Sequence, residues 1–162
     1  MEIERKYLIK ELPDLSKYEK EVIEQGYLNR NPAVRIRKSN DDYYMTYKNR
    51  GNHSQKNAIV SEEYNLPLNK EAYEHMRPKC DGELISKDRY LIPLDNGLTG
   101  ELDVFKGFLE GLYFIEVEFP DEEAAKAFKE PDWFGRDVSA DRRYSNAALS
   151  LLTDKKDIPE AE

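Results

Sequence analysis

The chain has 162 residues, 39% of them hydrophobic and 36% charged, which is enough apolar material for the core of one domain. Its net charge of −8 excludes binding to an extended nucleic acid, because no large basic surface is available to neutralise a phosphate backbone. The single cysteine, Cys80, excludes an internal disulfide, and no apolar stretch has the length of a membrane span. We therefore expect a cytoplasmic protein that binds neither extended nucleic acid nor a membrane.

The order of predicted elements is that of a mainly β protein. Alternating apolar and polar residues predict eight strands, at 1–7, 21–28, 33–38, 43–48, 58–68, 83–92, 99–106 and 112–119. One helical turn is expected at 11–16, and helices are expected at 69–77, 121–128 and 143–152. Asn69 and Asp121 are suitable N-caps for the first two helices. A loop is expected from Gly51, and residues 153–162 are expected to form a disordered tail. Eight short strands favour an antiparallel sandwich or closed barrel, as one domain over residues 1–152.

Charged side chains collect on one face of nearly every predicted strand. Because side chains alternate between the two faces, Glu2, Glu4 and Lys6 share one face of the first strand. The same alternation pairs residues on the later strands, namely Arg35 with Arg37, Lys87 with Arg89, Glu101 with Asp103, and Glu116 with Glu118, with Lys48 and Glu63 as single members. Apolar residues such as Ile36, Val104 and Val117 occupy the opposite face.

These charged rows allow two interpretations. In an ordinary barrel the apolar rows would fill the interior and the charges would face solvent. Alternatively, the charges line a polar lumen and the apolar rows face outward, where the predicted helices can cover them. We favour the polar lumen, because both signs of charge are concentrated in strand-specific rows rather than interspersed as on a solvated surface.

The charge balance of such a lumen indicates its ligand. Its six cations and seven carboxylates would sum to −1. A bare polyanion would be repelled by the carboxylates, whereas a polyanion that carries a divalent metal satisfies both signs. Clustered carboxylates suit Mg²⁺ or Mn²⁺, and arginine binds phosphate through two parallel hydrogen bonds.

The residues resemble those of the CYTH domain family, also called the triphosphate tunnel metalloenzymes. The family's N-terminal Glu-x-Glu-x-Lys motif corresponds to Glu2, Glu4 and Lys6. Further matching segments follow in order, at 34–37, 46–48, 87–90, 101–105, 115–119 and 138–146, so that the resemblance runs from residue 2 to about residue 149. It implies an eight-stranded antiparallel barrel that forms a tunnel, with a few helices packed outside.

The resemblance also implies roles for individual residues. Substrate phosphates would be bound by the basic residues, namely Lys6, Arg35, Arg37, Lys48, Lys87 and Arg89, with Arg143 at the tunnel mouth. Mg²⁺ or Mn²⁺ would be held by carboxylates, namely Glu2, Glu4, Glu116 and Glu118, with Glu63 and Asp103 as further candidates. Glu4, Lys6 and Glu118 are the expected catalytic residues. Glu101 and Asp103 either bind metal or hold the basic side chains in place. The chain departs from the family at Ser61, where a second glutamate is common, and at Ile59, where a basic residue is common.

The function expected from this resemblance is metal-dependent hydrolysis of a triphosphate, with inorganic tripolyphosphate as the substrate and pyrophosphate and phosphate as products. Alternatives are a class IV adenylate cyclase or a thiamine triphosphatase. A third alternative is a non-catalytic module that binds polyphosphate or nucleotide, although a pure binder needs no excess of carboxylates. A homodimer is compatible with the sequence.

Overall fold

The computed structural model describes residues 1–49, 58–152 and 157–159. Within them the strands are β1 (Glu2–Ile9), β2 (Glu19–Arg30), β3 (Ala33–Ser39), β4 (Asp42–Asn49), β5 (Ile59–Leu68), β6 (Asp81–Pro93), β7 (Thr99–Phe105), β8 (Tyr113–Glu118) and β9 (Phe134–Asp137). The α-helices are α1 (Lys70–Met76), α2 (Glu122–Ala127) and α3 (Asn146–Leu149). Short 3-10 helices are η1 (Leu15–Lys17), η2 (Arg77–Lys79), η3 (Asp95–Gly97), η4 (Gly107–Leu109) and η5 (Arg142–Tyr144).

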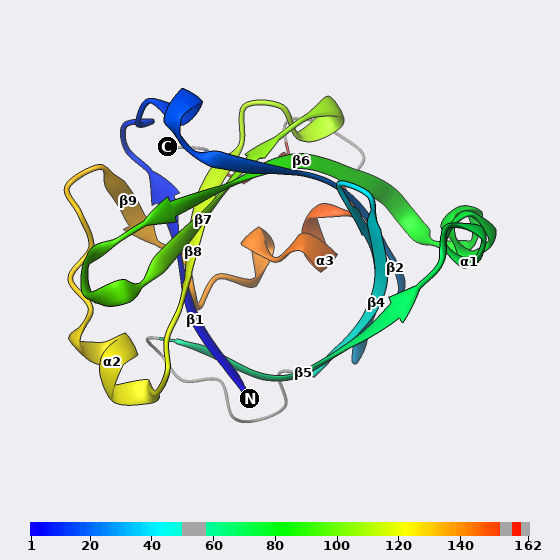
Figure 1. Cartoon of the computed structure of the whole chain (residues 1–162), viewed down its shortest axis with the longest axis horizontal. Coiled ribbons are helices and arrows are strands. Elements are labelled where there is room, and N and C mark those ends of the chain that lie inside the picture. The colour runs from blue at the N-terminus through cyan, green and yellow to red at the C-terminus, as the bar shows by residue number, and fades with distance from the viewer. Residues whose placement is uncertain (50–57, 153–156, 160–162) are drawn as a thin grey trace.

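Eight antiparallel strands form a closed barrel, as expected. The order is β5-β4-β3-β2-β6-β7-β8-β1, and β1 closes the ring by pairing with β5, Glu2 opposite Ser61 and Glu4 opposite Ile59. Figure 1 shows this ring, with α1 and α2 outside it and the segment that carries α3 crossing its outline. Because the ring is closed, each of the eight barrel strands pairs with a neighbour on both sides over at least part of its length.

The ninth strand, β9, is missing from the sequence prediction, which expected a loop there. Four residues that include Gly135 give too short an alternation to recognise. β9 pairs with β1 at Tyr7 and Ile9, beyond the point where β5 stops. Arg5 on the outer face of β1 fastens this arrangement, because its guanidinium donates to the Asp137 carboxylate at 2.8 Å and to the Ala125 carbonyl of α2 at 2.8 Å.

The apolar outer rows are covered much as the sequence predicts. Val117 and Leu102 belong to a buried cluster on the outside of β1, β7 and β8, which α2 covers with Ala125. Asn69 and Asp121 are the N-caps of α1 and α2, each accepting a backbone N–H at 2.7 Å.

The last predicted helix is wrong in both shape and position. Instead of one helix over 143–152, the chain forms η5 and α3, separated by the extended residue Ser145. Ser145 interrupts the helix because its side chain caps the next one, accepting the Ala148 N–H at 3.1 Å. The segment lies at one end of the barrel interior, where Tyr144 and Leu149 pack against Leu8 of β1 in a second apolar cluster.

Two expectations fall largely outside the described residues. The loop expected after Gly51 lies outside them, as do residues 153–156 and 160–162 of the expected tail. Within that tail Ile158 is described, and it packs against the apolar cluster around Leu8. None of the described helices is long and apolar enough to span a lipid bilayer.

Candidate active site in the barrel

The barrel contains a cavity of about 570 Å³ that is lined by the charged rows. Ten of the charged residues singled out from the sequence line it, namely Glu2, Glu4, Lys6, Arg35, Arg37, Lys48, Glu63, Arg89, Glu101 and Glu116. Directly opposed residues of antiparallel strands share a face, so the pairing of Lys6 with Glu116 and of Lys48 with Glu63 brings both signs of charge inward. The charged face therefore points into the barrel, and the alternative of an ordinary apolar interior is excluded.

One side of the cavity, formed by β1, β5 and β8, is rich in carboxylates. Lys48 reaches across to it, with its Nζ atom 2.7 Å from Glu2, 3.4 Å from Glu4 and 3.9 Å from Glu63. Burial alone would lower the pKa of Lys48, but Glu4 and Glu2 outweigh it and raise the pKa above the ordinary value. Lys48 is thus the shared ion-pair partner of three carboxylates.

Two of these carboxylates, Glu2 and Glu4, have raised pKa values. Burial, together with the nearby Glu116 and Glu2 carboxylates, raises the pKa of Glu4 to about 8. Burial and a hydrogen bond to the Glu63 carboxylate raise the pKa of Glu2 as well. Burial alone would raise the pKa of Glu63, but its hydrogen bond with Glu2 and the nearby Lys48 outweigh burial and lower it. Carboxylates clustered in this way are a donor set that suits a bound cation.

The carboxylates fit a metal ion whose remaining ligands come from water and from the substrate. No three carboxylate, histidine or cysteine side chains in the described part of the chain form a ready-made metal site. Mg²⁺ is usually held by only one or two carboxylates, with water and substrate phosphates as its other ligands. Glu2, Glu4 and Glu116 line the cavity and supply such oxygens.

A buried ion cluster lies beside the acidic side. Asp103 is fully buried and accepts hydrogen bonds from Lys87 Nζ at 2.7 Å, Arg89 Nε at 2.8 Å and Arg89 Nη2 at 3.1 Å. Burial alone would raise the pKa of Asp103, but Arg89 and Lys87 outweigh it and lower the pKa. Burial lowers the pKa of Lys87 to about 7. Asp103 therefore orients two cations and has no free side toward the cavity.

The opposite side of the cavity carries arginines without carboxylate partners. Arg37 donates to Gln25 at 2.8 Å, and Arg35 donates to the Thr46 hydroxyl at 3.2 Å. Burial and the neighbouring Arg35 lower the pKa of Arg37. Among the described residues, four cavity-lining arginines form no ion pair, namely Arg30, Arg35, Arg37 and Arg142. The cavity is thus divided into an acidic wall, containing Glu2, Glu4, Glu63 and Glu116, and an arginine wall, containing these four arginines.

Four of the predicted site residues do not line the cavity. Lys87 and Asp103 are buried behind its surface, each with a side chain that is 0% exposed. Glu118 lies opposite Glu4 on β8 but is exposed at the rim. Arg143, whose side chain is 67% exposed, turns away and pairs with Asp141 at 2.6 Å. Its neighbour Arg142 lines the cavity instead, because successive side chains in a 3-10 turn point about 120° apart.

Sequence reasoning missed the lining contributed by β2 and by the C-terminal segment 138–147. Tyr27 lines the cavity next to Arg35, its partner across the β2–β3 pair. Asn146 lines it from the C-terminal segment and accepts a hydrogen bond from Lys87 Nζ at 3.1 Å. Lys6 Nζ donates to the Tyr144 carbonyl of the same segment at 3.0 Å. The motif at 138–146 was the available signal, but alternation cannot show that this segment returns to the barrel.

Two similar proteins and a similar solved structure all carry the name inorganic triphosphatase. An inorganic triphosphatase of Nitrosomonas europaea is 39% identical over 153 residues, covering 93% of this chain and 97% of that protein. An inorganic triphosphatase of Acetivibrio thermocellus is 37% identical over 150 residues, covering 91% of this chain and 92% of that protein. A solved crystal structure of an inorganic triphosphatase superposes with a TM-score of 0.69 at 36% identity, covering 94% of this chain and 96% of that one.

The family comparison covers the whole barrel. The model of the CYTH domain matches residues 1–150, which include every strand from β1 to β9 and the segment that carries Asn146. The match therefore includes both walls of the cavity as well as the fold. The chain belongs to the CYTH domain family.

Proposed function

We propose that this protein hydrolyses inorganic tripolyphosphate to pyrophosphate and phosphate in the presence of Mg²⁺ or Mn²⁺. The observation that carries the proposal is the division of one cavity into an acidic wall and an arginine wall. A linear triphosphate that carries a divalent cation is complementary to both walls at once. The names of the two relatives, both inorganic triphosphatases at 37–39% identity over most of the chain, support this substrate.

The acidic wall would hold the metal. Glu2, Glu4 and Glu116 are its cavity-lining donors on β1 and β8, with Glu63 beside them and Glu118 at the rim. A bound Mg²⁺ or Mn²⁺ supplies neutralising charge for the phosphate oxygens and a position for water. Without a cation these carboxylates repel a polyanion, so binding of metal and of substrate should depend on each other.

The basic residues would bind the phosphate chain. Within the part of the chain that the structure describes, Arg35 and Arg37 form no ion pair, and guanidinium groups bind phosphate through paired hydrogen bonds. Arg89 reaches the cavity with its Nε–H bonded to Asp103, which holds the guanidinium in a fixed orientation. Charge stabilisation and positioning account for most of the catalysis of phosphoryl transfer, so a rigid basic wall suits this reaction.

The deciding experiment is a phosphate-release screen on tripolyphosphate, pyrophosphate, ATP and thiamine triphosphate, with Mg²⁺, with Mn²⁺ and with chelator. We expect tripolyphosphate to be cleaved fastest, no turnover in chelator, and poor cleavage of pyrophosphate, whose two phosphates cannot reach both ends of the basic wall. A parallel assay for cyclic AMP tests the cyclase alternative. Undiminished turnover in excess chelator, or faster release from thiamine triphosphate, would contradict the proposal, and binding without turnover would indicate a non-catalytic module.

A further inference from the structure

Asn146 links the buried ion cluster to the cavity. It is the first residue of α3 and lines the cavity, while its Oδ1 atom accepts a hydrogen bond from Lys87 Nζ at 3.1 Å. Lys87 itself is completely buried, and its second partner is Asp103 at 2.7 Å. Asn146 therefore lies between Lys87 and the space available to a ligand.

The contact with Lys87 determines which way the Asn146 amide points. Lys87 Nζ donates to the amide oxygen, so that oxygen faces Lys87 and the NH₂ group faces away from it. Within the described part of the chain, Asn146 Nδ2 donates to no other group. An amide donor held in this way, on the lining of a cavity rich in arginine, is suited to a phosphate oxygen.

We propose that Asn146 binds a phosphate oxygen of the substrate through Nδ2, and that Lys87 is a positioning residue that acts through Asn146. The inference rests on the proposed function for the identity of the anion. It changes the role expected of Lys87, which the sequence suggests as a direct phosphate ligand. The hydrogen bond that Lys87 donates polarises the amide and makes its outward N–H a stronger donor, although Lys87 does not contact the ligand.

The test uses Asn146→Asp, which has nearly the same shape. An aspartate keeps an oxygen toward Lys87 but replaces the outward donor with a second, negatively charged oxygen. The added carboxylate also repels a polyanion, so Asn146→Asp should bind the substrate at least about tenfold more weakly. Asn146→Ala separates the two roles because it adds no charge: if Asn146 served only to hold Lys87, substrate binding would be unchanged in this variant.

Affinity is measured by calorimetry with Mg²⁺ and a tripolyphosphate analogue whose imido bridges resist hydrolysis. Asn96→Asp, in the exposed turn η3, is the matched control for the added charge and should change Kd less than twofold. Asn146→Ala, which removes the donor without adding charge, should weaken binding by about three- to tenfold. Wild-type affinity in Asn146→Ala would overturn the inference. Calorimetry measures binding separately from turnover. If the wild-type chain bound the analogue but did not hydrolyse tripolyphosphate, the proposed hydrolysis would be refuted, whereas the affinities of the Asn146 variants would still test the inference.

Discussion

Asp103 is the residue whose placement differs most from its expected role. As a metal ligand it would need a free oxygen in the cavity, yet both of its oxygens bind Lys87 and Arg89. Replacing Asp103 with Asn would leave two buried cations without their shared counter-charge. We expect the free energy of unfolding to fall by about 3 kcal/mol, measured by urea denaturation.

Glu101→Gln is the matched control for this substitution. Glu101 is on the same strand and contacts Arg89 once, at 3.4 Å, with a side chain that is 37% exposed. Its loss should cost less than about 1 kcal/mol. An Asp103→Asn variant as stable as wild type, with a weakened dependence on metal, would show that Asp103 binds metal after all.

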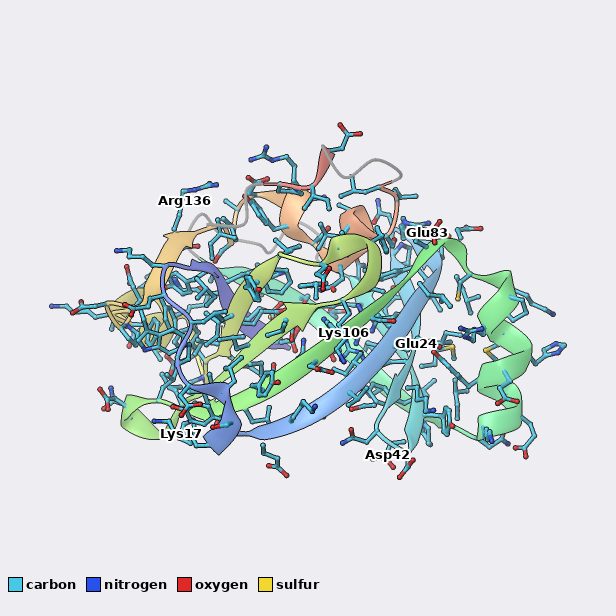
Figure 2. The ribbon with its side chains drawn as sticks, turned by 90° about the horizontal axis from the view of Figure 1, so that it is seen from above. Lys17, Glu24, Asp42, Glu83, Lys106 and Arg136 are labelled. Carbon is cyan, nitrogen blue, oxygen red and sulfur yellow. The ribbon has the colours of Figure 1, made fainter. Side chains whose placement is uncertain are left out.

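At the scale of elements, the Glu24 carboxylate helps to hold α1 against the barrel, beside the packing of Tyr73 on Tyr43. Glu24 on β2 accepts from Arg77 Nε at 2.8 Å and from the Tyr73 hydroxyl at 2.8 Å, and Figure 2 shows Glu24 on the side of the barrel where α1 lies. The hydrogen bond from Arg77 is the main cause that lowers the pKa of Glu24.

This attachment should depend on pH with a definite sign. A carboxyl group whose pKa is lowered by folding stabilises the protein above its unfolded pKa of about 4.3 and loses that effect as the pH falls. Glu24→Gln should therefore be less stable than wild type by about 1 kcal/mol at pH 7, and the difference should disappear as the pH falls from about 5 to 3. Unfolding midpoints across this range provide the measurement, with the exposed Glu19→Gln of the same strand as control. A difference that is the same at pH 3 and pH 7 would show that the Glu24 charge is irrelevant.

The barrel elements were predictable because their pattern is local, whereas β9 and the C-terminal segment were not. Period-two alternation identifies each strand and assigns Glu4 and Arg37 to the face that proves to be internal. The position of α3 depends instead on contacts distant in sequence, such as that between Glu83 N and the Ser150 carbonyl at 2.7 Å. Asn146 could therefore be recognised only within a motif and not as a lining residue.

At the scale of the whole molecule, the acidic wall and the arginine wall are expected to contribute differently to catalysis. Glu4→Gln removes a charge from the acidic wall, and Arg37→Ala removes one guanidinium from the arginine wall. Neither change should lower the unfolding midpoint much, because Glu4 is buried near the carboxylates of Glu116 and Glu2, and Arg37 is buried near Arg35 and forms no ion pair with a described residue.

Steady-state kinetics of these two variants on tripolyphosphate, measured over a range of Mg²⁺ concentrations, test the division of the cavity most directly. Glu4→Gln should lose mainly kcat, and higher Mg²⁺ should restore part of it. Arg37→Ala should show a large rise in KM that Mg²⁺ does not repair, with kcat/KM reduced about ten- to a hundredfold. If both variants instead lose stability together and retain normal kinetics once folded, the charged rows are structural and the cavity is not the active site.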